Sequence, residues 1–212
     1  MKTTKEDILE KVNVLYNKYG IRSVTMEDVA RELGISKKTL YQYVSDKEDL
    51  VEKVMMYHSM KAGKMFRAAA QESLNAIEQV FRFNHMVHRT MKETNFSRDY
   101  DLQKYYPKIY EKLMSIKMER MHESMIGNLR KGKKEGLYRK ELNEEIITKM
   151  YLHRIMHVAS EEIMTVSEFT SPKYIFELYV YHIRGVATQK GIEFLEANID
   201  KLIPKTDDHE SS

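Results

Sequence analysis

The stretch that decides the fold is TMEDVARELGISKKTLYQY, residues 25–43. Its first helix is expected to begin after Thr25, because the Thr hydroxyl and the Asp28 carboxylate are spaced as a capping box. Gly34 ends that helix, since glycine tolerates the positive φ that a tight turn requires. The next Ser caps a second, short helix over residues 37–43. Two helices joined by such a turn form a helix-turn-helix, in which the second helix enters the major groove of DNA.

A small apolar core is predicted between these two helices and a helix before them. Residues 5–19 carry apolar side chains at the i, i+4, i+7 spacing of an amphipathic helix, which Gly20 ends. The small side chain of Ala30 permits a steep crossing of the helix pair. Any corner between two packed helices has a similar core, so the core alone does not identify a DNA-binding motif. The residues expected to fill it from the pair are Val29, Leu33, Ile35, Leu40 and Tyr43.

The outward-facing residues of the second helix favour DNA binding over a merely structural corner. Lys37 and Lys38 have the chemistry to donate to guanine, and Gln42 has the chemistry to pair with adenine. Lys47 begins the following helix beside free backbone N–H groups, a position suited to a phosphate. Residues 1–50 contain 9 Lys/Arg and 9 Asp/Glu, so this prediction depends on where a few cations lie and not on net charge.

The remainder of the chain predicts an all-α fold. The 212 residues include only 8 Gly and 3 Pro, and Lys, Glu and Met are abundant. Helical periodicity covers residues 73–93, 107–133, 142–166 and 172–190, with a shorter helix over 192–199 and breaks at 94–101, 132–137 and 171–172. We expect an N-terminal three-helix helix-turn-helix DNA-binding domain at 1–50, a C-terminal helical ligand-binding and dimerisation domain at 51–204, and a disordered tail at 205–212.

Composition excludes several classes of protein and site. With no Cys, the chain has no disulfide, no thiolate zinc site and no cysteine nucleophile. No apolar run approaches the roughly 18 residues that span a bilayer, and the charged N-terminus lacks the apolar region of a signal peptide. Nucleophile elbows, HExxH motifs and phosphate-binding glycine loops are missing from the sequence. We therefore expect a soluble, cytoplasmic protein that is not an enzyme and uses no cofactor.

Residues 20–50, GIRSVTMEDVARELGISKKTLYQYVSDKEDL, closely resemble the DNA-binding signature of the TetR family of transcriptional regulators. One departure is Val44, where the family usually has an aromatic residue, and this change is expected to loosen packing at the next helix. The resemblance implies phosphate contacts by Thr25, Tyr41 and Lys47, although a core position is the alternative for Tyr41. It further implies that Lys37, Lys38, Thr39 and Gln42 face bases or the adjacent backbone, and that Tyr43 bridges packing and the DNA backbone.

Two later segments, residues 102–107 and 131–137, resemble the regulatory domain of the same family more weakly. This likeness implies a helical sensor whose last two long helices form a homodimer. The two heads would lie about 34–36 Å apart on a palindromic double-stranded operator. The long helix from Asp46 onward would be the lever between pocket and heads, and repression is favoured over activation. A core stripe within one chain is the alternative for the interface residues, which are Ile155, Val158, Ala159, Ile175, Leu178, Tyr179, His182, Ile183 and Val186.

An apolar pocket for a small, lipophilic effector is implied by the resemblance together with the Met and aromatic residues of the middle helices. Helical spacing fits a filled core equally well, so a packed bundle is the alternative. The candidate lining residues are Phe66, Phe81, Met86, Tyr106, Ile109, Leu113, Met121, Met125, Tyr151 and Met156.

Two other functional classes compete with an effector-responsive regulator. His153, His157 and Glu161 are spaced four residues apart, so they share one helical face and have the chemistry to bind a divalent cation. A metal-responsive regulator is therefore an alternative, but core or interface histidines are the favoured interpretation, and we expect no metal site. The second competing class is a helical adaptor that binds another protein, with basic amphipathic stretches that would also touch a membrane surface.

Overall fold

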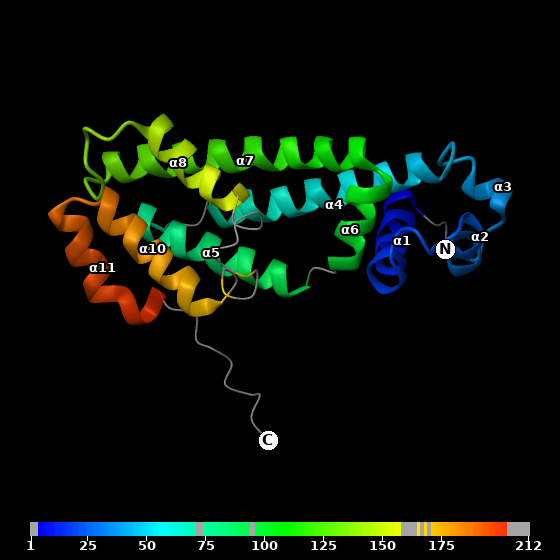
Figure 1. Cartoon of the computed structure of the whole chain (residues 1–212), viewed down its shortest axis with the longest axis horizontal. Helices are drawn as coiled ribbons and strands as arrows, with labels where there is room; N and C mark the ends of the chain where they lie inside the picture. Colours follow the sequence, from blue (N-terminus) through cyan, green and yellow to red (C-terminus); the bar gives the residue numbers. More distant parts are fainter. Residues whose placement is uncertain are drawn as a thin grey trace, which may run out of the picture. The chain divides into compact units, whose positions relative to one another are not determined.

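The computed structural model describes residues 4–70, 74–93, 96–157, 165, 168 and 171–202. Regular structure in these residues is helical, and the predicted all-α fold is confirmed. The tail predicted to be disordered at 205–212 lies outside the described residues. The helices, labelled in Figure 1, are α1 (Lys5–Tyr19), α2 (Met26–Leu33), α3 (Lys37–Leu40), α4 (Lys47–Ala70), α5 (Ala76–Glu93), α6 (Phe96–Tyr105), α7 (Pro107–Lys134), α8 (Glu144–His157), α10 (Pro172–Val186) and α11 (Gln189–Leu202).

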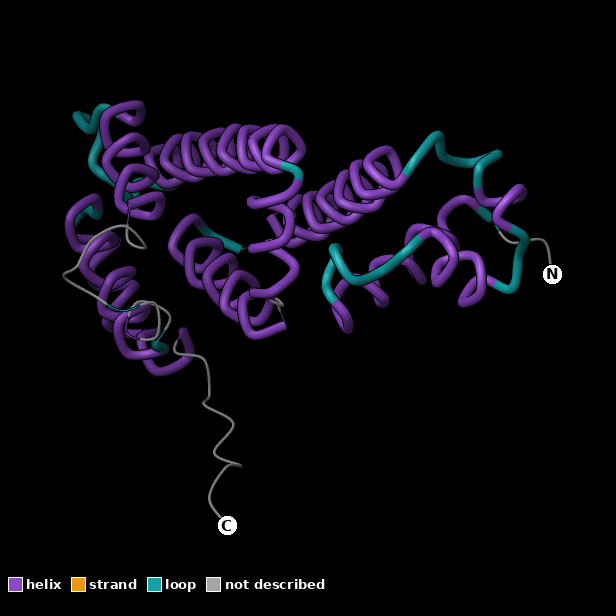
Figure 2. The backbone as a smooth tube through the Cα atoms, turned by 45° about the vertical axis from the view of Figure 1, so that its right-hand side comes forward, coloured by secondary structure: helices purple, strands orange, loops and turns teal. Residues whose placement is uncertain are grey.

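The chain divides into two compact units. The head unit comprises Met1–Met65 and Glu93–Lys117, and the body unit comprises Phe66–Lys92 and Met118–Ser212. Helices joined by loops build both units (Figure 2). The head unit is larger than the 1–50 segment predicted from sequence, because residues of α4, α6 and α7 also pack on its core.

The head core is formed by apolar side chains from α1, α2, α3, α4, α6 and α7. A capping box between Thr4 and Asp7 begins α1, and Gly20 ends it at the position predicted. The Tyr16 ring is fully buried, and burial raises the pKa of its hydroxyl. The core side chains exposed by no more than 2% are Ile8, Val12, Tyr16, Ile21, Val29, Leu40, Leu50, Val51 and Val54.

The end of the second motif helix differs from the prediction. The α-helix covers only Lys37–Leu40, and the next residues continue as tight turns in which the Tyr43 N–H donates to the Leu40 carbonyl at 2.9 Å. The turns move Tyr43 out of the predicted core, so that it is 37% exposed, while Val44 is 4% exposed and fills the core in its place. The expectation of Tyr43 as a core residue is therefore wrong, and Val44 packs without a larger side chain.

One other predicted boundary is corrected, and the start of α4 is defined by its cap. Residues 94–101 were expected to be a break, but α6 occupies Phe96–Tyr105. Tertiary contacts stabilise it: Leu102 is 5% exposed in the head core, and Arg98 donates to Asn17 Oδ1 of α1 at 2.8 Å. The cap of α4 is Asp46, whose carboxylate accepts the first-turn N–H of Asp49 at 2.8 Å.

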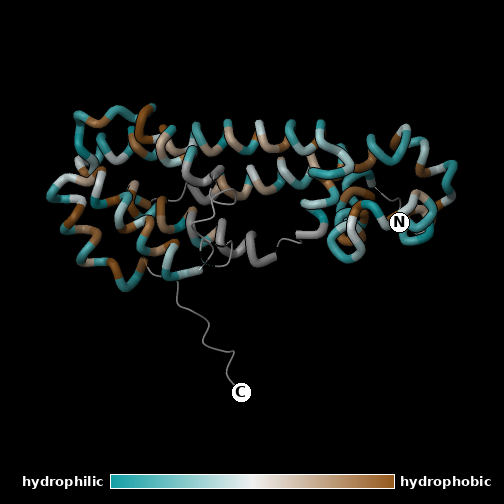
Figure 3. Tube along the Cα trace, in the orientation of Figure 1, coloured by the Kyte–Doolittle hydropathy of each residue, from teal (hydrophilic) through white to brown (hydrophobic). Residues whose placement is uncertain are grey.

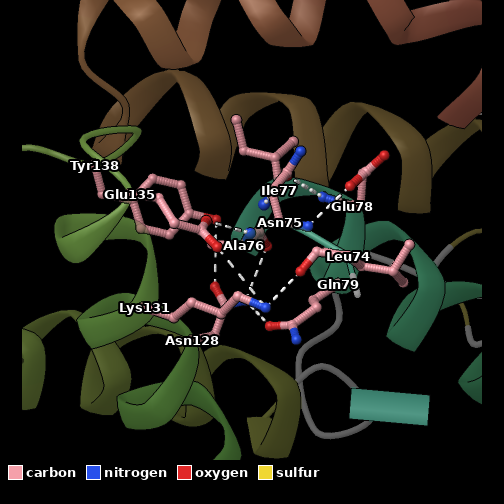
Figure 4. Close-up of polar contacts among 10 residues, drawn as sticks. All are labelled: Leu74, Asn75, Ala76, Ile77, Glu78, Gln79, Asn128, Lys131, Glu135 and Tyr138. Atoms are coloured by element: carbon pink, nitrogen blue, oxygen red, sulfur yellow. Dashed lines mark hydrogen bonds and ion pairs between the residues drawn. The ribbon is translucent and has the colours of Figure 1, made fainter. Parts of the chain in front are cut away.

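The core of the body unit depends on close packing around Tyr138. Its ring is fully buried against Gly132 of α7, and its hydroxyl donates to Asn128 Oδ1 at 3.2 Å. The Asn128 side chain in turn donates to the Ala76 carbonyl at 2.8 Å, at the start of α5 (Figure 4). An isolated antiparallel bridge joins Tyr138 to Ala187, which explains why α10 ends at Val186 and not at the predicted residue 190.

Hydrophobic and hydrophilic residues alternate along the helices of each unit (Figure 3). In α10, for example, Ile183 is fully buried whereas Tyr181 is 77% exposed. No helix within the described ranges is long and apolar enough to traverse a bilayer.

Candidate nucleic-acid interface

The turn between α2 and α3 has the geometry that its sequence predicts. The Thr25 hydroxyl accepts the Asp28 N–H at 3.1 Å, while the Asp28 carboxylate accepts the Thr25 N–H at 3.0 Å. Gly34 lies in the left-handed region at φ 65° and ψ 31°. The Ser36 hydroxyl caps α3 by accepting the Thr39 N–H at 3.0 Å. Ala30 is only 4% exposed where the two helices cross. The two caps, the Gly34 turn and this close crossing together form a helix-turn-helix.

Four of the predicted DNA contacts expose their side chains to solvent. They are Lys38, Tyr41, Gln42 and Tyr43, and within the part of the chain that the structure describes these side chains make no hydrogen bond or ion pair. Tyr41 is 48% exposed, which excludes a core position for its ring. These side chains hydrogen-bond to water, and on binding they would replace those bonds with bonds to bases or phosphates. No bond to another described residue has to break, so this cluster is available for DNA.

Two predicted contacts, Thr25 and Thr39, use their hydroxyls within the head. Thr25 Oγ1 donates to Asp28 Oδ2 at 2.6 Å, and Thr39 Oγ1 lies 2.8 Å from Ser36 Oγ. A phosphate oxygen only accepts hydrogen bonds. The Thr25 proton must therefore turn away from the capping carboxylate before this hydroxyl donates to DNA.

Lys37 has an acidic partner that the sequence did not reveal. Its Nζ lies 2.9 Å from Glu27 Oε2 of α2, and the two side chains are 54% and 70% exposed. The hydrogen bond from Lys37 lowers the pKa of Glu27, and the same bond raises the pKa of Lys37. Because this ion pair is exposed, it is weak enough to open when Lys37 meets a nucleic acid.

Unlike the other predicted cationic contacts, Lys47 is partly buried and its ammonium group is bonded to the backbone. Its ammonium group donates to the Arg22 carbonyl at 3.0 Å, in the turn that leads from α1 into α2. Burial lowers the pKa of Lys47, and the carboxylates of Asp101 and Asp28 oppose that change. The ammonium still has two donors for a phosphate, but it is held by the protein and does not extend freely from α4.

The predicted pocket residues are distributed over both units. Tyr106, Ile109 and Leu113 pack against the head core. In the body unit, Phe81 and Tyr151 flank Tyr179, with ring centroids 6.3 and 6.1 Å away. The ring centroids of Phe66 and Phe83 lie 5.2 Å apart. Met86, Met121 and Met125 are half-buried, and the side chain of Met156 is not among those that the structure describes. None of the predicted pocket residues lines the surface hollow found on the body unit. This hollow is lined by His122, Glu123, Ile126, Gly127, Arg130 and Glu145.

The predicted dimer-interface residues of α10 lie largely inside the body unit. Tyr179, Ile183 and Val186 belong to its core, and Leu178 is also buried, which agrees with the alternative of an intrachain stripe. Ile175 and His182 are half-buried, and the His182 ring is tilted by 54° against the Tyr151 ring, with the ring centroids 5.2 Å apart. The side chain of Ile155 and the residues Val158 and Ala159 are outside the described residues.

The predicted metal site is only partly described. His153 is exposed on α8, but the side chain of His157 and all of Glu161 lie outside the described residues. Among the residues that are described, no three His, Cys, Asp or Glu side chains gather in a way that would hold a metal ion.

The geometry at the start of the chain defines a helix-turn-helix DNA-binding domain. Residues 8–54 match the family model described as bacterial regulatory proteins, tetR family. The N-terminal part of the chain therefore carries the DNA-binding domain of the TetR family of transcriptional regulators.

Three similar proteins extend this comparison over most of the chain. YvaF of Bacillus subtilis (strain 168), described as an uncharacterized HTH-type transcriptional regulator, is 27% identical over 169 residues, which are 79% of this chain and 88% of YvaF. A transcriptional regulator from Cytophaga hutchinsonii ATCC 33406 superposes with a TM-score of 0.72 at 17% identity, covering 86% of this chain and 98% of the other. CprB from Streptomyces coelicolor, a TetR family protein solved with its biological operator sequence, has a TM-score of 0.59 at 13% identity and coverages of 92% and 94%. At such identities the two solved structures share the fold alone.

Proposed function

We propose that this protein is a homodimeric repressor that binds a palindromic operator in the bacterial cytoplasm and is released by a small apolar effector. The observation that carries the proposal is the exposed cluster of Lys38, Tyr41 and Gln42 on a correctly capped helix-turn-helix. Backbone caps fix the cluster in place, so little ordering entropy is lost when it meets DNA. The operator complex of CprB supports the same use of a shared fold.

The side chains of the interface are assigned to base contacts or to phosphate contacts according to their chemistry. Gln42 is the candidate for a bidentate contact with adenine, and Lys38 for a contact with guanine. Tyr41 and Lys47 are assigned to phosphates, which fix orientation without reading sequence. Lys37 joins either group once its bond to Glu27 has opened.

Dimerisation is supported by large apolar side chains that one chain leaves in water. On α8, Ile146 is 55% exposed and Met150 is 65% exposed, and on α10 Tyr181 is 77% exposed. Exposed apolar side chains of this size favour burial against another protein surface. A second copy of the chain is the partner proposed, since a palindromic site requires two heads related by a two-fold axis.

Selection of bound duplexes from a random pool tests the proposal as a whole. We expect enrichment of a palindrome whose half-site centres lie about one helical turn apart, because two identical heads read successive major grooves. Non-specific binding to a scrambled duplex of equal length is the control. Enrichment of a single half-site would remove the dimer from the proposal, and failure to enrich any sequence would remove operator binding.

The apolar effector is supported by the aromatic side chains of the body unit. Tyr179 contacts Phe81 and Tyr151 from two other helices within the packed core of the body unit, and side chains of this kind line sites for lipophilic molecules. An effector releases DNA only if it binds better to the form with low operator affinity. We expect compounds that raise the melting temperature of the free protein to weaken its selected operator complex. A compound that binds tightly and leaves operator affinity unchanged would contradict this coupling.

A further inference from the structure

One residue of the turn between α1 and α2, Arg22, is held by groups from outside the helix-turn-helix. Its N–H donates to Asp101 Oδ2 at 3.0 Å, and its carbonyl accepts the Lys47 ammonium at 3.0 Å. Its guanidinium donates to the Tyr105 hydroxyl at 2.9 Å and lies over the Tyr105 ring, 5.0 Å from the centroid. Asp101 and Tyr105 both belong to α6, so α6 makes three of these four contacts.

Asp101 is well placed to transmit the position of α6. Its residue is 9% exposed, and a buried carboxylate is costly unless a donor satisfies it. The Arg22 N–H, 79 positions away in sequence, is that donor. α6 itself is fixed to α1 by the bond from Arg98 to Asn17 and by burial of Leu102. A rigid path therefore runs from α1 through α6 to the Arg22 peptide.

Arg22 lies next to two residues that are proposed to contact phosphates, Thr25 and Lys47. Arg22 lies three residues before Thr25, which caps α2, and its carbonyl holds the ammonium of Lys47. We propose that Asp101 is a positioning residue for the DNA interface: it fixes the Arg22 peptide so that Thr25 and Lys47 reach their phosphates together. This inference rests on the proposed operator binding. Asp101 itself touches no DNA and acts through Arg22.

The test compares Asp101→Asn with Asp99→Asn on the selected operator over a range of salt concentrations. Both substitutions remove one negative charge from α6. Among the residues that the structure describes, Asp99 is ion-paired only with Arg98 Nη2 at 3.0 Å, whereas the bond from Arg98 to Asn17 uses Nη1. We expect Asp101→Asn to bind about tenfold more weakly, because the Arg22 N–H then donates to a neutral amide oxygen in place of a charged carboxylate in each head, and the weaker bond holds the peptide less firmly. The slope of log affinity against log salt should fall by about 2 for two displaced Lys47 ammonium groups per dimer. Asp99→Asn should match the parent protein.

A double substitution separates positioning from general stability. Lys47→Met removes the ammonium and keeps the apolar stem, so it should lower the salt slope by the same amount as Asp101→Asn. Combining the two changes should give no further loss of slope, since both act on one contact. If Asp101→Asn lowers only the melting temperature, while affinity and slope of the folded protein remain at the parent values, Asp101 is structural and the inference is overturned.

Hydrogen exchange on the unmodified chain provides a measurement that needs no variant to fold. The Arg22 amide should exchange at least tenfold more slowly than in an unfolded chain, because Asp101 holds it. Exchange at the unfolded-chain rate would overturn the inference. If the parent protein binds no duplex selectively, the proposed function fails and this assignment falls with it. Selective binding by the parent, unchanged in Asp101→Asn, overturns the assignment alone.

Discussion

Gly132→Ala is expected to destabilise the body unit by about 3 kcal/mol, the upper range for overpacking a filled core. A Cβ at this position would overlap three atoms of the Tyr138 ring. That ring is fully buried, and its hydroxyl is bonded to Asn128, which also holds the start of α5 (Figure 4). The ring therefore cannot turn away without breaking this polar network. Thermal unfolding should show a midpoint about 10 °C below that of the parent protein.

Gly127→Ala is the matched control for this prediction. Gly127 lies on the same helix, and a Cβ there meets nothing within 4 Å. Glycine inside a helix is less favourable than alanine by about 1 kcal/mol, so this substitution should leave stability unchanged or raise it slightly. Equal melting temperatures for the two variants would show that Tyr138 does not pack against α7 as described.

The head motif was predictable from sequence because the signals that form it are local. The Thr25–Asp28 capping box, the left-handed Gly34 and the Ser36 cap each act within four residues, and the structure places all three as expected. The formation of α6 was not predictable, since it depends on Leu102 and Arg98 finding partners on α1. Contacts between distant residues leave no periodic pattern in the chain.

The same limit applies to the residues around the candidate site. The clusters of Glu27 with Lys37 and of Asp101 with Arg22 join separate elements, so a search for motifs within one helix misses them. In α10, helical spacing places Tyr179, Ile183 and Val186 on one face, but spacing does not say which surface covers that face. The structure assigns these three to the core of one chain, whereas exposed Tyr181 faces solvent.

Gln42→Ala is expected to weaken binding to the selected operator by about 2–6 kcal/mol, which is at least a thirtyfold loss. A good bidentate contact contributes about 1–3 kcal/mol of discrimination, and a dimer has two such contacts. The backbone presents Gln42 firmly, since its N–H donates to the Thr39 carbonyl at 3.1 Å next to fully buried Leu40. The salt slope should not change, because an amide side chain displaces no counterion. Mobility-shift titrations at several salt concentrations measure both quantities.

The discriminating feature of this prediction is its dependence on base sequence. Gln42→Ala should lose affinity for the selected operator and bind a scrambled duplex as the parent does, because the lost contact reads one base pair. Gln103→Ala makes the same chemical change at an exposed position of α6 in the same unit and should leave both affinities intact. A loss of equal size on every duplex would assign Gln42 to the phosphate backbone. Base selection would then have to come from Lys37 and Lys38, whose ammonium groups favour guanine.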